Sequence, residues 1–511
     1  MTLAHDPTGD DLFALDLDAR GIKSRALLGS VVIGSAQVAK MAVQLGTTMI
    51  LGRLLFPGDF GLVAMVYPII GFVQLFGSLG FGEAIVQREQ LRRSDVSGLF
   101  WLNLIIAVGL ALLAAALSPA AAWMYDETRV VPLMIAIAAI MPIGALGSIH
   151  GAILSRFMRF GIITRNELVS AWTGVAFTIA AALTGYGYWS LVLGQFVTAL
   201  VAVALAWNSL RFRPSRPAFT AQVWQDVRFG ANLTGANIAT FLTASGDNII
   251  IGTLNGKEAL GIYDRSYRLV VQPVGQLLSP ISSVALPFLS RLNTDTVEYR
   301  HVYLSFVRLI LLFTLPLMLA CIINADEVVS FLLGPRWQAA AATFAWISVG
   351  GLMSGFYSSL TWLFISQART AAMRRYMSFA AVFNLLSFAI GAIWGVVGVA
   401  ACAALVFLTV TVPVVSYGAT RSGPVGLRDL VYCILPYALT AVATAFLALL
   451  LGPYLREGLV QVLGSSLVCF VPFLILGGLM PAERKMMLFA FSKVRSFVKP
   501  SAATSCRSTD K

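Results

Sequence analysis

Polar side chains occur at a few positions inside long apolar stretches of this chain. Gln37, Lys40 and Gln44 are spaced by three and four residues, so a helix would carry all three on one face. An ionisable side chain inside a membrane-spanning helix faces protein or a water-filled cavity and marks a candidate pathway. The other candidates of this kind are Gln74, Asn237, Asp247, Asn248, Arg265, Arg268 and Gln272. Amides and cations together suit an anionic molecule, so the sequence predicts a hydrated, cationic cavity.

The charged candidates also have simpler interpretations. Lys40 could be the buried ion-pair partner of Asp247, and Asp247 could be interfacial because it falls near the predicted end of its helix. Arg265 and Arg268 could be solvated at the same interface. The sequence leaves open whether Lys40 contacts a transported molecule or an acidic neighbour.

Motifs that could indicate enzyme chemistry do not meet its requirements. GTLNGKE, at 252–258, has three residues between its glycines where a phosphate-binding loop has four, and Glu258 stands where Ser or Thr is needed. GSLGFGEA, at 77–84, ends an apolar stretch rather than a strand. Every predicted loop is short, so no soluble catalytic domain is expected. We therefore predict that the protein is not an enzyme, with no catalytic residue, no cofactor and no metal site.

The composition indicates an integral membrane protein. Of the 511 residues, 58% are hydrophobic and 12% are charged, and the mean hydropathy is +0.81. A soluble domain has about 25% charged residues. Because about 20 apolar residues span the hydrocarbon as a helix, we predict an all-α protein with fourteen transmembrane helices. Their expected ranges are 28–51, 61–82, 98–118, 131–153, 167–185, 188–209, 231–254, 263–287, 304–323, 340–365, 377–394, 396–417, 430–451 and 460–480.

Basic residues are divided unevenly between the two sides of these predicted helices. Of 36 Lys and Arg residues, 28 fall on the side of the N-terminus and seven on the opposite side. Cytoplasmic loops carry the excess of Lys and Arg, so both termini are expected in the cytoplasm. The net charge of +12 is scattered in twos and threes, so nucleic acid is not an expected partner.

The chain also resembles itself at an offset of 200 residues. Stretches 36–61 and 236–261 share seven identical positions, among them Gly46, Gly52 and Gly61. We interpret this as two pseudo-symmetric six-helix lobes in the same orientation, related by an axis along the membrane normal. The expected parts are a cytoplasmic tail (1–25), an N-lobe (26–210), a cytoplasmic linker (211–229), a C-lobe (230–418), two further helices (419–481) and a basic cytoplasmic tail (482–511).

The stretch ILGRLLFPGDFGLVAM, at 50–65, interrupts the first apolar run. Between Arg53 and Asp59 we expect a tight, outward-facing hairpin, with Pro57 and Gly58 turning the chain. Residues 255–261 would form the corresponding outward turn of the second lobe.

This hairpin and its surroundings resemble the polysaccharide transporter family, the oligosaccharide-lipid flippases of the multidrug/oligosaccharidyl-lipid/polysaccharide exporter superfamily. The family pattern ARLLxPxDFGLVAM is matched from Arg53 to Val63, and LGxGxAxxQR is matched from Gly80 to Arg88. DNIIIGTLNGKEALGIYDRSYRL, at 247–269, is similar to the family's seventh and eighth helices.

The resemblance implies a multi-pass protein of the bacterial inner membrane. By alternating access it would translocate oligosaccharide repeat units linked to undecaprenyl pyrophosphate, for exopolysaccharide or lipopolysaccharide biosynthesis. Implied partners are this lipid-linked oligosaccharide, membrane lipid, a coupling cation (H⁺ or Na⁺), and the polymerase and co-polymerase of the same pathway. Two other functions stay open. One is a drug/cation antiporter of the same superfamily, which usually has twelve spans. The other is an integral-membrane polysaccharide polymerase or ligase, which would need a large outward loop.

Overall fold

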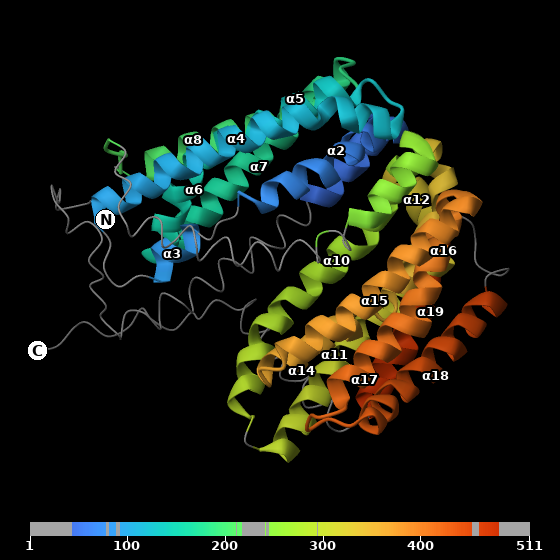
Figure 1. The fold of residues 1–511 in the computed structure, drawn as a ribbon. Coiled ribbons are helices and arrows are strands. Elements are labelled where there is room, and N and C mark those ends of the chain that lie inside the picture. Colours follow the sequence, from blue (N-terminus) through green and yellow to red (C-terminus); the bar gives the residue numbers. More distant parts are fainter. Residues whose placement is uncertain are drawn as a thin grey trace, which may run out of the picture. The chain divides into compact units, whose positions relative to one another are not determined.

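A computed structural model describes most of the chain's predicted membrane helices. The described residues are 43–77, 81–87, 92–210, 212–216, 241, 245–293, 295–451 and 459–479. Within them the elements are helices joined by short turns, and no β-strand occurs among these residues (Figure 1). The predicted all-α fold class is confirmed.

The chain divides into two compact units, each assembled from separate stretches of sequence. Unit 1 is drawn from Met1–Gln276, Val328–Ile347 and Ala381–Phe407, and unit 2 from Leu277–Glu327, Ser348–Ala380 and Leu408–Lys511. The lobes expected from the sequence are continuous segments, and their boundaries stay a prediction.

Five helices of unit 1 follow one another along the chain and pack together. They are α4 (Arg93–Tyr125), α5 (Val130–Ala138), α6 (Ile140–Arg156), α7 (Phe160–Leu183) and α8 (Trp189–Ser209) (Figure 1). Only 17% of the most apolar stretch of α4 is buried within the protein. The apolar surface that remains exposed suits contact with lipid, because hydrocarbon is the medium that leaves such side chains without a hydration cost.

α2 (Pro57–Leu75) begins shortly after the preceding helix ends at Leu54, so the predicted hairpin is present. The turn is shorter than expected, because Gly58 and Asp59 already belong to α2. A proline at the first helical position loses no hydrogen bond, since that N–H has no partner within a helix. The carboxylate of Asp59 accepts the backbone N–H of Phe56 at 2.9 Å and caps the new helix. The prediction that Gly58 turns the chain was therefore wrong.

α10 (Gly256–Arg291) begins seven residues before the expected start of the eighth span at 263. Asn255 is the single non-helical residue between helical residues 245–254 and α10. Gly256 has a φ of +82°, a left-handed conformation that glycine adopts without a steric penalty. Residues expected to form an outward loop are thus the first turns of α10.

Several other predicted spans are interrupted helices. The fourth span divides at Ala139 into α5 and α6. A short helix that the sequence did not indicate, α12 (Ala325–Leu333), precedes the tenth span. The short η2 (Pro335–Ala340) also precedes the tenth span, which comprises α13 (Ala341–Gly351) and α14 (Ser354–Ser366), and the eleventh is α15 (Thr370–Gly391). The twelfth runs from α16 (Gly395–Val406) through a π-helical turn (Phe407–Thr411) into α17 (Val412–Thr420).

Unit 2 is organised around α11 (Thr296–Ile323). This helix packs against α14, α18 (Leu427–Leu451) and α19 (Leu459–Leu479), while α14 also packs against α17. One face of α18 is apolar and exposed, with Tyr432 at 73% and Val442 at 69% exposure.

The described part of the chain contains eight helical stretches that are long and apolar enough to cross a membrane, or nine if α10 counts as one span. The chain is therefore a multi-pass membrane protein. The total of fourteen spans stays a prediction.

Candidate functional site

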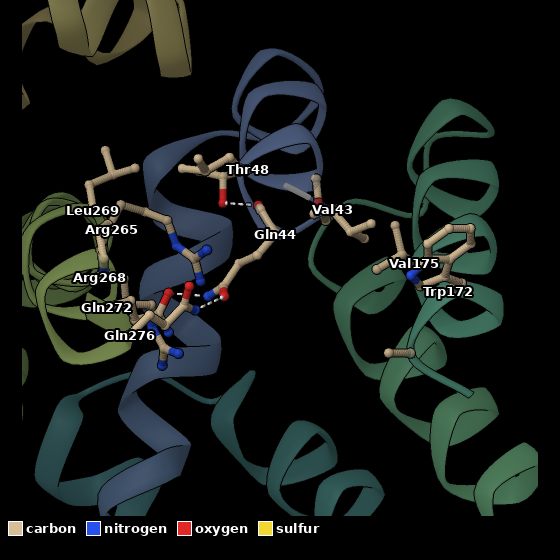
Figure 2. A pocket seen from close by; sticks show the side chains of 14 residues that line it. Val43, Gln44, Thr48, Trp172, Val175, Arg265, Arg268, Leu269, Gln272 and Gln276 are labelled. Atoms are coloured by element: carbon tan, nitrogen blue, oxygen red, sulfur yellow. Dashed lines mark hydrogen bonds between the residues drawn. The ribbon is translucent and has the colours of Figure 1, made fainter. Parts of the chain in front are cut away.

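A cavity of about 340 Å³ lies within unit 1. Helical residues 43–54, α7 and α10 supply its walls, and Figure 2 shows the side chains that point toward it. Its polar lining residues are Gln44, Thr47, Thr48, Arg265, Arg268, Gln272 and Gln276, with Trp172 and Val175 of α7 among the other lining residues. Its volume lies within the range of about 300–1,000 Å³ that is usual for small-molecule sites.

Two arginines of α10 share one carboxylate beside this cavity. Arg268 Nε donates to both carboxylate oxygens of Asp264, each at 2.9 Å, and Arg265 Nη2 lies 3.3 Å from Asp264 Oδ2. The Asp264 side chain is 7% exposed, whereas that of Arg268 is 38% exposed. One carboxylate cannot neutralise two guanidinium groups, so this group of three carries a net positive charge toward the cavity.

Aromatic rings orient the two guanidinium groups. The Arg265 guanidinium lies 4.1 Å from the ring centre of Phe60, and that of Arg268 lies 5.7 Å from the ring centre of Tyr67. Arg265 Nε is buried and has no hydrogen-bond partner among the described residues. A guanidinium has five N–H donors in a fixed fork, which matches two oxygens of a phosphate or carboxylate. The arrangement can therefore bind an anion.

Amide side chains connect α10 to the helix before the hairpin. Gln44 Nε2 donates to Gln272 Oε1, and Gln276 Nε2 donates to Gln44 Oε1 at 3.3 Å (Figure 2). These amides lie beside the arginines and offer donors and acceptors to a polar molecule. The structure thus brings four predicted residues together: Gln44, Arg265, Arg268 and Gln272.

A second cavity of about 470 Å³ in unit 1 contains another predicted residue, Gln74. α2, α4, α5, α6 and α8 contribute to its lining. Its polar residues are Tyr67, Gln74, Asn103, Ser148 and Gln195. Tyr67 is the residue whose ring faces Arg268, so it connects the two cavities.

The remaining predicted residues lie elsewhere. Asp247 is 8% exposed on helical residues 245–254 and accepts the backbone N–H of Asn248 at 2.7 Å, so it is buried within the protein. Tyr263 also hydrogen-bonds to its carboxylate. Asp247 and Asn248 line neither cavity. The predicted residues outside the described part of the chain are Gln37, Lys40 and Asn237.

Two features of the site were not predicted from the sequence. The spacing of Asp264 and Arg268 by four residues on one helix is a signal that could have identified their ion pair. The placement of Trp172 opposite α10 has no comparable signal, because it depends on the packing of α7 in unit 1.

α2 and α10 cross near their N-terminal ends inside unit 1. An ideal Cβ at Gly61 would lie 2.6 Å from the carbonyl carbon of Lys257, and one at Gly261 would lie 2.7 Å from that of Pro57. Each of these Cβ positions is also close to the backbone nitrogen of the other glycine, at 3.1 and 3.0 Å. Positions 57 and 61 become 257 and 261 at the offset of 200, so the two contacts are equivalent. We call this contact the α2–α10 crossing.

Two polar contacts hold neighbouring parts of unit 1. Lys257 Nζ lies 2.6 Å from Glu127 Oε2, and the indole N–H of Trp337 donates to the carbonyl of Gly52 at 2.7 Å. Trp337 is fully buried and packs against Phe60, with ring centres 5.5 Å apart. The crossing is therefore part of a closed, well-packed region.

Comparison with known proteins gives consistent similarities. The sequence profile of a family described as "Polysaccharide biosynthesis protein" matches residues 50–342, more than half of the chain. Over 285 residues the chain is 26% identical to the teichuronic acid biosynthesis protein TuaB of Bacillus subtilis (strain 168), covering 55% of this chain and 59% of the relative. Over 304 residues it is 25% identical to the succinoglycan biosynthesis transport protein ExoT of Rhizobium meliloti (strain 1021), covering 60% of each. The match thus spans about three fifths of the length of these relatives.

The fold also has a counterpart among solved structures. That of the lipid II flippase MurJ, in an inward closed conformation, matches with a TM-score of 0.68 at 14% identity. The match covers 88% of this chain and 98% of the other. At this identity the similarity concerns the fold alone.

Proposed function

Because the chain belongs to the family of polysaccharide biosynthesis proteins, we propose that it moves undecaprenyl-pyrophosphate-linked oligosaccharide units across the bacterial inner membrane. The single observation that carries this proposal is the pair of arginines that share Asp264 beside a cavity in a membrane protein. In this proposal Arg265 and Arg268 bind the pyrophosphate, and Gln44 and Gln272 contribute hydrogen bonds.

The chemistry of the cargo explains why cations are needed here. A pyrophosphate and its sugars are strongly hydrated, so they cannot enter hydrocarbon unaided, whereas the polyprenyl tail can stay in the bilayer throughout. Bidentate contacts from guanidinium groups replace part of the hydration of phosphate oxygens. A site with a net positive charge therefore lowers the cost of bringing the headgroup into the membrane.

Transport by alternating access needs two states that open on opposite sides. The α2–α10 crossing is a closed contact made by two backbones, which makes it a suitable gate. Opening it would require α2 and α10 to separate near Gly61 and Gly261. A proton or sodium gradient would bias the two states, with the buried Asp247 carboxylate as the acid that responds to the cation.

The alternative functions fit the site less well. A drug/cation antiporter would bind cationic cargo, which the excess positive charge of Arg265 and Arg268 opposes. A polysaccharide polymerase or ligase would need catalytic side chains on a large outward loop. We therefore propose a transporter that is not an enzyme, with both termini in the cytoplasm and with the polymerase and co-polymerase of its pathway as partners.

Reconstituted vesicles provide the direct test. Purified protein in liposomes containing a fluorescent undecaprenyl-pyrophosphate oligosaccharide should make the inner-leaflet sugar accessible to a membrane-impermeant quencher. A hydrogen bond to a charged group contributes about 1.5–3 kcal/mol, so Arg268→Gln should slow this exposure roughly 10- to 100-fold. Arg268→Lys keeps the charge without the fork and should give an intermediate rate.

A control variant shows whether removing any arginine slows translocation or only removing an arginine of the cavity. Arg300 pairs with Asp429 at 3.2 Å in unit 2 and is 48% exposed, so Arg300→Gln should leave the rate within about twofold. Unchanged translocation in an Arg265→Gln/Arg268→Gln double variant would refute the assigned site. An absence of translocation by the parent protein would refute the function.

A further inference from the structure

The second cavity of unit 1 differs in chemistry from the first. Its described lining contains no charged side chain, and its polar groups are the amides of Gln74, Asn103 and Gln195 with the hydroxyls of Tyr67 and Ser148. The rest of the lining is apolar or glycine, such as Ile70 and Gly144. The positive charge described above is confined to the first cavity.

The two cavities meet at one pair of side chains. Tyr67 lines the second cavity, and its ring faces the guanidinium of Arg268, which lines the first. Tyr67 also hydrogen-bonds to Gln195, another residue that lines the second cavity. A molecule held by Arg268 would therefore lie next to Tyr67, which lines the second cavity.

We propose that the second cavity binds the sugar residues nearest the pyrophosphate of a lipid-linked oligosaccharide, an inference that rests on the proposed function. Sugar hydroxyls both donate and accept hydrogen bonds, and a carboxamide offers a donor and an acceptor in one plane. Apolar walls suit the C–H faces of a pyranose ring. A neutral polar lining avoids the desolvation cost that a charged group would add in binding an uncharged sugar.

Individual side chains of the cavity are available to different degrees. Gln74 is exposed, and its amide makes no hydrogen bond to another described residue, so it is available to a ligand. Asn103 already donates to Ser148 Oγ at 2.8 Å and to the Ala145 carbonyl at 3.3 Å, which leaves its carbonyl oxygen to accept. Gln74 is therefore the principal sugar-binding residue, and Asn103 is a preoriented acceptor.

A steric variant tests the cavity without removing a polar group. Gly144 of α6 lines the second cavity, and a Cβ added there would meet no atom within 4 Å. Gly144→Leu should fill part of the cavity, while removal of a helical glycine favours the helix. Gly109 of α4 also has open space around its Cβ position but lines neither cavity, so Gly109→Leu is the matched control.

The readout is the affinity for two probes, measured by native mass spectrometry of the full chain. One probe is undecaprenyl pyrophosphate, and the other is lipid-linked oligosaccharide extracted from the cells that make this protein. The parent should bind the oligosaccharide-bearing lipid at least tenfold more tightly than undecaprenyl pyrophosphate. Gly144→Leu and Gln74→Leu should each reduce this ratio at least fivefold and leave the affinity for undecaprenyl pyrophosphate within twofold.

Other variants and outcomes distinguish the inference from the proposed function. Arg268→Gln should weaken binding of both probes, and Gly109→Leu should weaken neither. An unchanged ratio in both Gly144→Leu and Gln74→Leu would overturn the sugar site while leaving the pyrophosphate site standing. Failure of the parent to bind either probe would overturn the proposed function and this inference with it.

Discussion

Replacing Gly61 by alanine should open the α2–α10 crossing. The added methyl group would lie 2.6 Å from the carbonyl carbon of Lys257, whereas non-bonded carbon atoms attract at about 3.5–4.0 Å. The group that it meets belongs to the backbone of α10, so no side-chain rotation can relieve the contact. α2 and α10 must move apart by roughly 1 Å for the variant to keep both helices intact.

The size of the effect follows from this overlap. Inserting a methyl group into close packing costs about 1–3 kcal/mol. The helical preference of alanine over glycine, about 0.5–1 kcal/mol, applies to α2 whether the crossing is closed or open and therefore cancels. A difference of 1–3 kcal/mol changes the ratio of closed to open protein roughly 5- to 150-fold. Gly261→Ala should behave alike, because its Cβ would lie 2.7 Å from the Pro57 carbonyl carbon.

Disulfide crosslinking can measure the closed state directly. A Cβ at Gly58 would lie 3.5 Å from Cγ of Glu258, so cysteines at these two positions are close enough to test for a bridge. In a background without the five native cysteines, the Gly58→Cys/Glu258→Cys pair should crosslink readily under mild oxidation. Adding Gly61→Ala should reduce the crosslinked fraction and the rate of sugar translocation together.

Gly46→Ala is the control, because a Cβ at Gly46 would meet no atom within 4 Å. It should change neither the crosslinking nor the translocation. If Gly61→Ala crosslinks as fast and as completely as the parent, α2 and α10 do not cross as closely as described, and the gate proposed here is refuted.

Three further predictions concern single side chains. Burial raises the pKa of Glu127, but hydrogen bonds and charges from Lys257 and Arg129 outweigh burial and lower the pKa overall. The contact with Lys257 is therefore complete above the usual Glu pKa and is lost as the pH falls through the lowered value. Crosslinking at the α2–α10 crossing should decrease only in acid, and Glu127→Gln should remove this pH dependence. Trp337→Phe leaves the Gly52 carbonyl without its donor and should reduce the free energy of unfolding by about 1–3 kcal/mol, measured by thermal unfolding in detergent. Asp247→Asn should make translocation insensitive to collapse of the proton and sodium gradients, and a retained dependence in vesicles would exclude Asp247 as the coupling acid.

Much of the fold could be predicted because membrane helices are long and uniformly apolar. Internal hydrogen bonding is obligatory in hydrocarbon, so an apolar stretch of sufficient length has few structures other than a helix. α8 and α18 accordingly begin and end close to their expected residues. The interruptions in other spans were missed because a short π-helical turn or a division at an alanine leaves the apolar pattern unchanged.

The position of the arginines shows how a local error affected the predicted site. Lys257 and Glu258 are charged, so the start of α10 resembled a loop. The eighth span was therefore predicted to begin at residue 263, seven residues after the observed start. From the observed start at Gly256, Arg265 and Arg268 lie about 14 and 18 Å along the helix axis. At these positions both arginines line the first cavity. The second cavity was not predictable, because it depends on five helices packing together.

The equivalent contacts of Gly61 and Gly261 correspond to those of an isologous dimer interface, in which one residue contacts a second residue of the other copy and the reverse contact also forms. If each half were a separate subunit of a homodimer, one substitution at this glycine would alter both symmetry-related contacts of the interface. When both halves belong to one chain, each contact can change by its own substitution. Both positions are glycine in this chain, while the residues that they contact differ, with Pro57 in α2 and Lys257 in α10. The crossing therefore has the reciprocal contacts that the predicted two-lobe repeat would produce.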